Sequence, residues 1–219
     1  MARYSLKFAK EGYIKYTSHL DMLRLFKRAF KKAGVHLEHS QGFNPHPKMS
    51  FAQPLSLGYT SIGELIEFET REVFEEETIA ENLRAQMPEG IRIIECKALS
   101  PKEKSLAAAC TAAEYIIAIP LPEGADIPRE LGTGFLAQEQ IVVKKKKKKS
   151  REFKDVEIKA MIHSLSIDVL DGNLFMSTTL AAGSNENLSP ELLIQAFSAY
   201  VDFPIQRENV EVLRVKLIL

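Results

Sequence analysis

RYSLKFAKEGYIKYTSHLDMLRLFKRAFKKAG, residues 3–34, decides how the chain begins to fold. Apolar Tyr, Leu and Phe alternate with polar side chains across residues 3–10, which is the period of a half-buried strand. After a turn, Ser18 followed by Asp21 resembles the capping box that opens a helix. Apolar residues then recur at helical spacing until Gly34, a residue type that commonly ends a helix. The stretch predicts a strand followed by a helix.

The next segments extend this beginning to a unit of six elements. We predict a short strand, a longer strand, a helix and a closing strand at residues 35–39, 64–70, 74–87 and 91–99. The order β-α-β-β-α-β is that of a ferredoxin-like unit. A second interpretation continues the second strand in residues 49–52 and leaves residues 41–48 as a rigid excursion from it.

The same order then recurs in the second half of the chain. The predicted elements are a strand, a weak helix, a strand, a hairpin turned at Asp171 and Gly172, a helix and a strand, at residues 113–121, 128–138, 140–144, 165–180, 190–200 and 209–219. We therefore predict an α+β fold of two tandem ferredoxin-like units, with mainly antiparallel sheets and helices on one face. The expected domains are residues 1–105 and 106–219.

Charge is distributed in blocks although the formal net charge is +0. Residues 1–60 hold ten Lys and Arg against three Asp and Glu, and residues 61–95 hold three against ten. Residues 141–160 are basic again, with nine against three. Such basic zones meet phosphate or an acidic partner, or they are matched by the acidic blocks within the fold.

Cysteine usage and hydropathy indicate a cytoplasmic protein. Cys96 and Cys110 fall outside any CxxC spacing and have apolar neighbours, which is typical of buried free thiols in a reducing compartment. No window approaches the ~20 apolar residues that a membrane helix needs, and the first residues lack the apolar segment of a signal peptide. We expect no membrane contact.

The helix predicted from Ser18 onward has one apolar face and one basic face. The basic face carries Arg24, Lys27, Arg28, Lys31 and Lys32. One interpretation is a solvated face whose late lysines are stabilised by the helix dipole. The other is a strip that contacts phosphates, which adds affinity without sequence specificity.

A second basic feature is the six-lysine run at residues 144–149, with Lys146 and Lys147 at its centre. A block of like charges repels itself and is expected to be exposed. It is either a solvated hairpin tip or an arm that contacts a nucleic-acid backbone.

SQGFNPHPKMSFAQPLSLGYTS, residues 40–61, is rich in Pro and Gly. His46 stands between two prolines that restrict the backbone, so its ring is held beside Asn44 and Lys48, close to Phe43. Preorganisation of this kind favours recognition or proton transfer. The structural alternative is a proline-rich crossover that packs over the sheet.

Catalytic motifs are scarce. The chain has no HExxH, no CxxC and no glycine-rich phosphate loop. His36 and His39 have a metal-like spacing but lack a third ligand nearby. His19, at a helix start, is a candidate acid or base beside His46, although capping or packing is the commoner role of such a residue. We expect no metal and no other cofactor.

Three parts of the first half carry a resemblance to a known family. Residues 16–34, residues 40–61 and the following Gly63 and Glu64 resemble the N-terminal signature of the radical-SAM-linked family, a bacterial domain of unknown function. In that family the domain is encoded beside, or fused to, a radical SAM protein, so the resemblance implies a radical SAM partner. A radical SAM catalyst needs three closely spaced cysteines for its iron–sulfur cluster, and this chain has 2 cysteines. An accessory role is therefore implied.

These observations leave three functional hypotheses. The first is a non-catalytic accessory module that binds a structured RNA, such as transfer or ribosomal RNA, for the radical SAM protein. Its expected contacts are Arg24, Lys27, Arg28, Lys31 and Lys48 with phosphate, Phe43, Asn44 and His46 with the substrate, and Lys146 and Lys147 as a further contact. The second is an endoribonuclease-like or RNA-modifying enzyme that uses His46 or His19 as general acid or base. The third is a protein-docking module that binds no nucleic acid.

Overall fold

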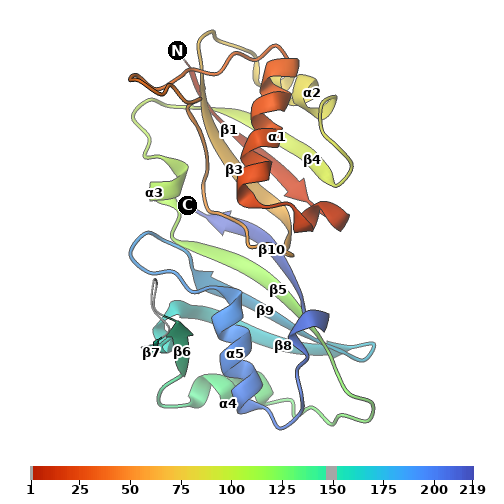
Figure 1. Cartoon of the computed structure of the whole chain (residues 1–219). Coiled ribbons are helices and arrows are strands. Elements are labelled where there is room, and N and C mark those ends of the chain that lie inside the picture. Colours follow the sequence, from red (N-terminus) through yellow and green to blue (C-terminus); the bar gives the residue numbers. More distant parts are fainter. Residues whose placement is uncertain (1, 147–151) are drawn as a thin grey trace. The chain divides into compact units, whose positions relative to one another are not determined.

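The computed structural model describes residues 2–146 and 152–219 and has the α+β fold expected from the sequence (Figure 1). The chain divides into two compact units between Cys110 and Thr111. Residues 106–110, which the sequence-based boundary assigned to the second unit, therefore belong to the first. No helix of the described residues is long and apolar enough to cross a membrane.

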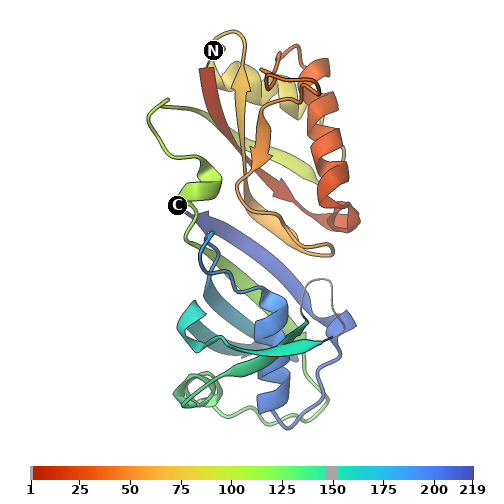
Figure 2. The ribbon, with the colours of Figure 1, turned by 60° about the vertical axis from the view of Figure 1, so that its left-hand side comes forward.

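The first unit is an antiparallel sheet in the strand order β4-β1-β3-β2, with helices α1 and α2 over one face (Figures 1 and 2). This is the ferredoxin-like arrangement. Its elements are β1 (Ala2–Lys10), η1 (Gly12–Tyr16), α1 (His19–Lys32), β2 (Met49–Phe51), β3 (Thr60–Thr70), α2 (Glu76–Arg84), β4 (Ile91–Leu99) and α3 (Leu106–Ala109).

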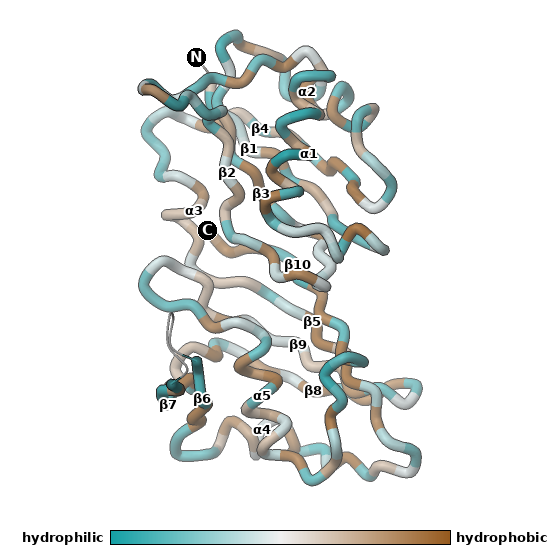
Figure 3. The backbone as a smooth tube through the Cα atoms, viewed as in Figure 1, coloured by the Kyte–Doolittle hydropathy of each residue, from teal (hydrophilic) through white to brown (hydrophobic). Residues whose placement is uncertain are grey.

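Helix α1 begins and packs as its sequence dictates. The Ser18 side chain accepts a hydrogen bond from the backbone N–H of Asp21, which satisfies a free donor of the first turn. Along the helix, hydrophobic and hydrophilic residues alternate in Figure 3, and the apolar ones face the sheet. The ring of Phe26 lies 4.9 Å from that of Phe8, and Phe30 lies 4.6 Å from Phe68. These contacts place the basic residues of α1 on its outer side.

The second strand is interrupted by a loop. Residues 35–39 form no regular strand; they make only isolated bridges, one of which joins Leu37 to Thr70. The Lys48 N–H donates to the Glu38 carbonyl over 2.7 Å, the Glu38 N–H donates to the Glu69 carbonyl, and the Glu69 N–H donates to the Lys48 carbonyl. The strand thus leaves the sheet after Glu38 and resumes at Lys48, running on into β2. The prediction of a regular strand at 35–39 was wrong, and the excursion predicted at residues 41–48 spans residues 39–47.

The second unit repeats the topology with the strand order β10-β5-β9-β8, all antiparallel. Its elements are β5 (Ala112–Pro120), α4 (Leu131–Ala137), β6 (Val142–Lys146), β7 (Phe153–Glu157), η2 (Lys159–Met161), β8 (Ile162–Leu170), β9 (Asn173–Ala181), α5 (Pro190–Tyr200), η3 (Arg207–Asn209) and β10 (Glu211–Ile218). The predicted hairpin at residues 165–180 is β8 and β9, and it turns at Asp171, whose φ is 49°.

The strand predicted at residues 140–144 does not belong to this sheet. It forms part of β6, which pairs only with β7 in a separate two-stranded sheet. Of the residues in β6, Val143 alone is buried. A strand with so little apolar surface cannot occupy the interior of a sheet, and Figure 3 shows β6 and β7 as strongly hydrophilic.

Both cysteines are free and buried, as predicted. Burial, followed by the negative charges of Glu76 and Glu77, raises the pKa of Cys96 to about 12. The thiolate, which is the reactive form, is therefore scarce near neutral pH.

We expect the Cys96 thiol to react with iodoacetamide at about pH 8 at least about a hundred-fold more slowly in the folded protein than in the unfolded chain. A Cys110→Ser variant leaves Cys96 as the single thiol, so mass spectrometry reads one rate. Equal rates in the folded protein and in denaturant would contradict the burial described for this residue.

Candidate nucleic-acid interface

The loop that interrupts the second strand is closed at its base by Ser40. The Ser40 hydroxyl oxygen accepts a hydrogen bond from the His46 backbone N–H (3.1 Å) and lies 2.8 Å from His46 Nδ1. The Ser40 backbone N–H donates to the His46 carbonyl (2.9 Å), and His39 bridges to Pro47. These bonds hold the loop in one conformation without burying its tip.

A groove of about 290 Å³ lies between the C-terminal half of α1 and the two ends of this loop. Its floor is apolar and consists of Phe30, Val35, Leu37 and Pro47. Its rim carries Lys27, Lys31, His36, His39 and Arg71. We call these nine residues the basic groove. No acidic side chain is among the described residues that line it.

Backbone contacts position the rim residues that lie outside α1, and Lys27, Lys31 and Arg71 are exposed. The Arg71 N–H donates to the His36 carbonyl over 3.1 Å, which brings Arg71 from the end of β3 beside the groove. His39 Nδ1 donates to the Leu37 carbonyl over 3.1 Å. His36 Nδ1 lies 3.5 Å from a carboxylate oxygen of Glu72, just outside the lining. Lys27, Lys31 and Arg71 thus present three permanent positive charges around an apolar floor.

The other predicted residues of α1 lie outside the groove. Arg24 bonds to Asp21 over 3.0 Å and, after the hydrogen bond from Ser18, helps to lower the pKa of that carboxyl. Arg28 is exposed on the same helix. On the basic face of α1, Lys27 and Lys31 therefore line the groove, whereas Arg24 and Arg28 do not, and Arg24 is already paired.

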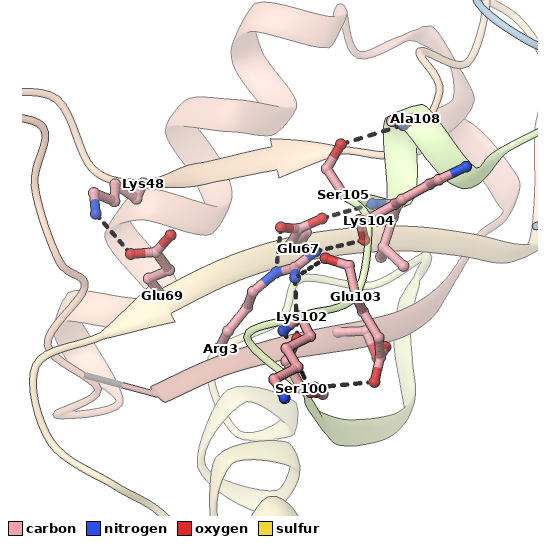
Figure 4. Close-up of polar contacts among 12 residues, drawn as sticks. Arg3, Lys48, Glu67, Glu69, Ser100, Lys102, Glu103, Lys104, Ser105 and Ala108 are labelled. Atoms are coloured by element: carbon pink, nitrogen blue, oxygen red, sulfur yellow. Dashed lines mark hydrogen bonds and ion pairs between the residues drawn. The ribbon is translucent and has the colours of Figure 1, made fainter.

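Lys48 is not among the residues that line the groove, and it points toward Glu69 (Figure 4). Its ammonium group bonds to Glu69 over 2.7 Å, and this hydrogen bond raises the pKa of Lys48. Glu69 follows the core residue Phe68, so its side chain lies on the sheet face away from α1. The pair holds the exit of the loop on β3.

A second ion pair organises the same sheet face (Figure 4). Arg3 bonds through Nε to Glu67 over 2.6 Å and donates to the carbonyls of Glu103 and Lys104. Glu67 also accepts from the Leu106 N–H over 2.7 Å. The hydrogen bond that Arg3 donates to Glu67 raises the pKa of Arg3. The network fastens residues 100–106 to the sheet.

A large cavity lies beside this network and is acidic. Its volume is about 970 Å³, and its lining contains one basic side chain, Arg3, and five glutamates, Glu67, Glu69, Glu75, Glu76 and Glu77. A phosphate would be repelled there. The cavity is therefore no candidate for binding a nucleic-acid backbone.

His19 faces a small cavity in the interior. The cavity, of about 20 Å³, is also lined by Lys10 and Glu64, which are 3% and 2% exposed, and by Phe51, whose ring lies 5.2 Å from that of His19. This volume holds one water molecule and no nucleobase. His19 has the surroundings of a packed residue.

His46 is exposed and shares its hydrogen bond with a hydroxyl, that of Ser40. A hydroxyl beside an imidazole is the beginning of a nucleophile and base pair, which also needs a group that orients the imidazole. Within residues 2–146 and 152–219, no carboxylate bonds to His46. The Ser40 contact acts in this structure as a loop closure.

In the second unit, the described part of the lysine run lies on β6. Lys146 pairs with Phe153 in the register of β6 and β7, and Lys145 pairs with Lys154. Phe153 is exposed. Lys147 lies outside the described residues. The hairpin therefore displays lysines next to an aromatic ring.

The structure brings together part of the predicted site and adds to it. Lys27 and Lys31 line one groove with the two ends of the loop whose exposed tip carries Phe43, Asn44 and His46. Arg71, His36 and His39 were not predicted to join them. The signal for Arg71 was its position after the third strand, since the second strand of a ferredoxin-like sheet pairs with the third. No group of three or more His, Cys, Asp and Glu in the described residues could hold a metal ion.

Comparison with known proteins shows a fold and a family. A chain of the crystal structure of a Cbf5-Nop10-Gar1 complex is similar with a TM-score of 0.54 and 10% sequence identity over 98% of this chain, which spans 48% of that chain. An unknown protein from Galdieria sulphuraria matches over 100% of this chain and 99% of its own at 14% identity, with a TM-score of 0.29. No curated protein matches. The bacterial family described as "Uncharacterized protein conserved in bacteria (DUF2344)" matches residues 3–190, and the chain belongs to it.

Proposed function

We propose that the protein is a non-catalytic RNA-binding module that works with a radical SAM protein and holds RNA phosphates in the basic groove. One observation supports this proposal most: Lys27, Lys31 and Arg71 surround an apolar floor, and no acidic side chain is among the described residues of the lining. Phosphate contacts by Lys and Arg supply most of the affinity of such modules.

The contrast within the first unit favours this position over others. Five glutamates of the unit line the large cavity, and two of these pair with Arg3 and Lys48, whereas no acidic side chain is among the described residues that line the basic groove. An anion is therefore attracted to one surface and repelled from the other. The hairpin of β6 and β7 offers a further contact through Lys146.

The radical SAM partner enters this proposal through the resemblance of residues 16–34 and 40–61. The partner would supply the chemistry, because a chain with 2 cysteines cannot hold the cluster of a radical SAM enzyme. The role left to this module is to bind and present the substrate.

A histidine-dependent RNA-cleaving or RNA-modifying enzyme is the second candidate. One observation favours it, the 2.8 Å contact between the Ser40 hydroxyl and His46. Its check is an activity assay on RNA recovered with the protein, where unchanged turnover of His46→Ala and His19→Ala variants excludes both residues as acid or base.

Capture from native cells tests the leading proposal. The tagged protein is purified after ultraviolet crosslinking, the attached RNA is sequenced, and the co-purifying proteins are identified. We expect specific RNA species and a radical SAM protein, with RNA recovery reduced at least about ten-fold by Lys27→Glu/Lys31→Glu. If the unaltered protein recovers the partner protein but no more RNA than Lys27→Glu/Lys31→Glu recovers, the proposal is refuted in favour of protein docking.

A further inference from the structure

Phe43 stands out because a large apolar ring is fully exposed at the tip of a closed loop. All residues from Gln41 to His46 are exposed, so the ring lies in a stretch of the loop that is open to solvent. The contacts of Ser40 with His46 fix the backbone on both sides of the tip. The loop therefore exposes an aromatic ring to solvent on a backbone whose conformational freedom is already restricted.

The loop begins and ends at the basic groove. His39 and Pro47 line the groove and bridge to each other, and Phe43 lies midway between them in the chain. Four extended residues span at most about 14 Å, which limits the distance from Phe43 to the bridge. A ligand bound by its phosphates in the groove can therefore present a neighbouring base to this ring.

We infer that Phe43 stacks on an unpaired base of the RNA whose phosphates the basic groove binds, so that the module recognises a single-stranded or looped segment and not a continuous duplex. Asn44, beside the ring, carries an amide that can donate to and accept from a base edge. Bases in a duplex are already stacked on each other, whereas unpaired bases stack readily on aromatic side chains. This inference rests on the proposed function.

The charges around Phe43 favour RNA over a protein as the occupant. An aromatic anchor of a protein interface is usually surrounded by other contacts that exclude water. Phe43 is fully exposed, and the two ends of its loop line a groove with Lys27, Lys31 and Arg71, which matches a polyanion. Docking of a protein on Phe43 is the alternative that the test must separate.

A Phe43→Trp variant reports the contact directly, because the chain contains no tryptophan and the new indole is therefore the single one. The probes are an RNA strand of about 12 nucleotides and the duplex of the same strand with its complement. We expect the single strand to quench the tryptophan fluorescence in a saturable manner and the duplex to leave it unchanged. A fluorescent label at the 5′ end of the strand monitors binding independently. Binding of the strand without quenching of the tryptophan would overturn the inference.

Removal of the ring gives the affinity measurement. We expect Phe43→Ala to weaken binding of the single strand by about 5- to 150-fold and binding of the duplex by less than about two-fold. Phe43→Leu, which keeps an apolar side chain without a π face, is expected to resemble Phe43→Ala. The matched control is Tyr13→Ala, since Tyr13 is an equally exposed aromatic residue of the first unit that does not line the groove.

The outcomes separate this inference from the proposed function. Absence of binding to both probes by the unaltered protein refutes the proposed function and the inference together. Binding to both probes that Phe43→Ala leaves unchanged refutes only the stacking of Phe43. Loss of a co-purifying protein in Phe43→Ala and Phe43→Leu, with unchanged RNA affinity, assigns the ring to protein docking and also refutes the inference.

Discussion

Lys27→Glu/Lys31→Glu is expected to weaken RNA binding by about 25-fold or more at about 0.1 M salt. The estimate follows from counterion release, since each phosphate contact on a single strand contributes about 0.7 to the logarithmic salt slope. Two contacts then account for about 1.4 logarithmic units of affinity at that salt concentration. Repulsion by the introduced carboxylates adds to this loss.

The matched control reverses two charges elsewhere on the first unit. Lys102 and Lys104 are exposed and lie outside the groove lining, so Lys102→Glu/Lys104→Glu has the same net charge as the groove variant. We expect this control to lose less than about three-fold in affinity through the long-range field alone. Equal losses in both variants would mean that net charge, and not the groove, determines binding. Circular dichroism of each variant confirms that α1 remains folded.

Gly90→Ala is expected to destabilise the first unit by about 2–4 kcal/mol. Gly90 has a φ of 87°, which side chains rarely adopt, and an added Cβ would lie 2.5 Å from the Glu11 carbonyl oxygen and 2.9 Å from Ile14 Cγ2. The Gly90 carbonyl also accepts the Glu11 N–H, so the two turns cannot separate without losing a hydrogen bond.

Gly12→Ala separates backbone strain from this clash. Gly12 adjoins the same turn with a φ of 62°, and its added Cβ meets nothing within 4 Å. We expect about 1 kcal/mol of destabilisation there. Denaturant unfolding of both variants gives the difference. A Gly90→Ala variant as stable as Gly12→Ala would show that the two turns are not in contact as described.

Much of the fold could be predicted because it depends on local periodicity. The alternation in residues 3–10 and the capping residue Ser18 determine β1 and the start of α1 without any distant contact. The hairpin at Asp171 was equally local. The second strand could not be predicted in full, since its two parts are joined by a hydrogen bond from the Lys48 N–H to the Glu38 carbonyl that no periodicity reveals.

The candidate site could be predicted only where a single element carries it. Lys27 and Lys31 were identified because they share a face of one helix. Arg71 required knowledge that Leu37 pairs with Thr70, which is a tertiary contact. Lys48 was expected to contact phosphate together with the basic residues of α1, but its partner Glu69 lies on the other face of the sheet. Charge counts along the chain cannot show which charges the fold neutralises.

The most direct test of the central claim is the salt dependence of RNA affinity, measured in parallel for the unaltered protein and for Lys27→Glu/Lys31→Glu. Three contacts from Lys27, Lys31 and Arg71 predict that the slope of log affinity against log salt is about −2 or steeper for the unaltered protein. The variant is predicted to have a slope shallower by about 1.4. A flat dependence for the unaltered protein, or equal slopes for the two proteins, would contradict the assignment of RNA phosphates to the basic groove.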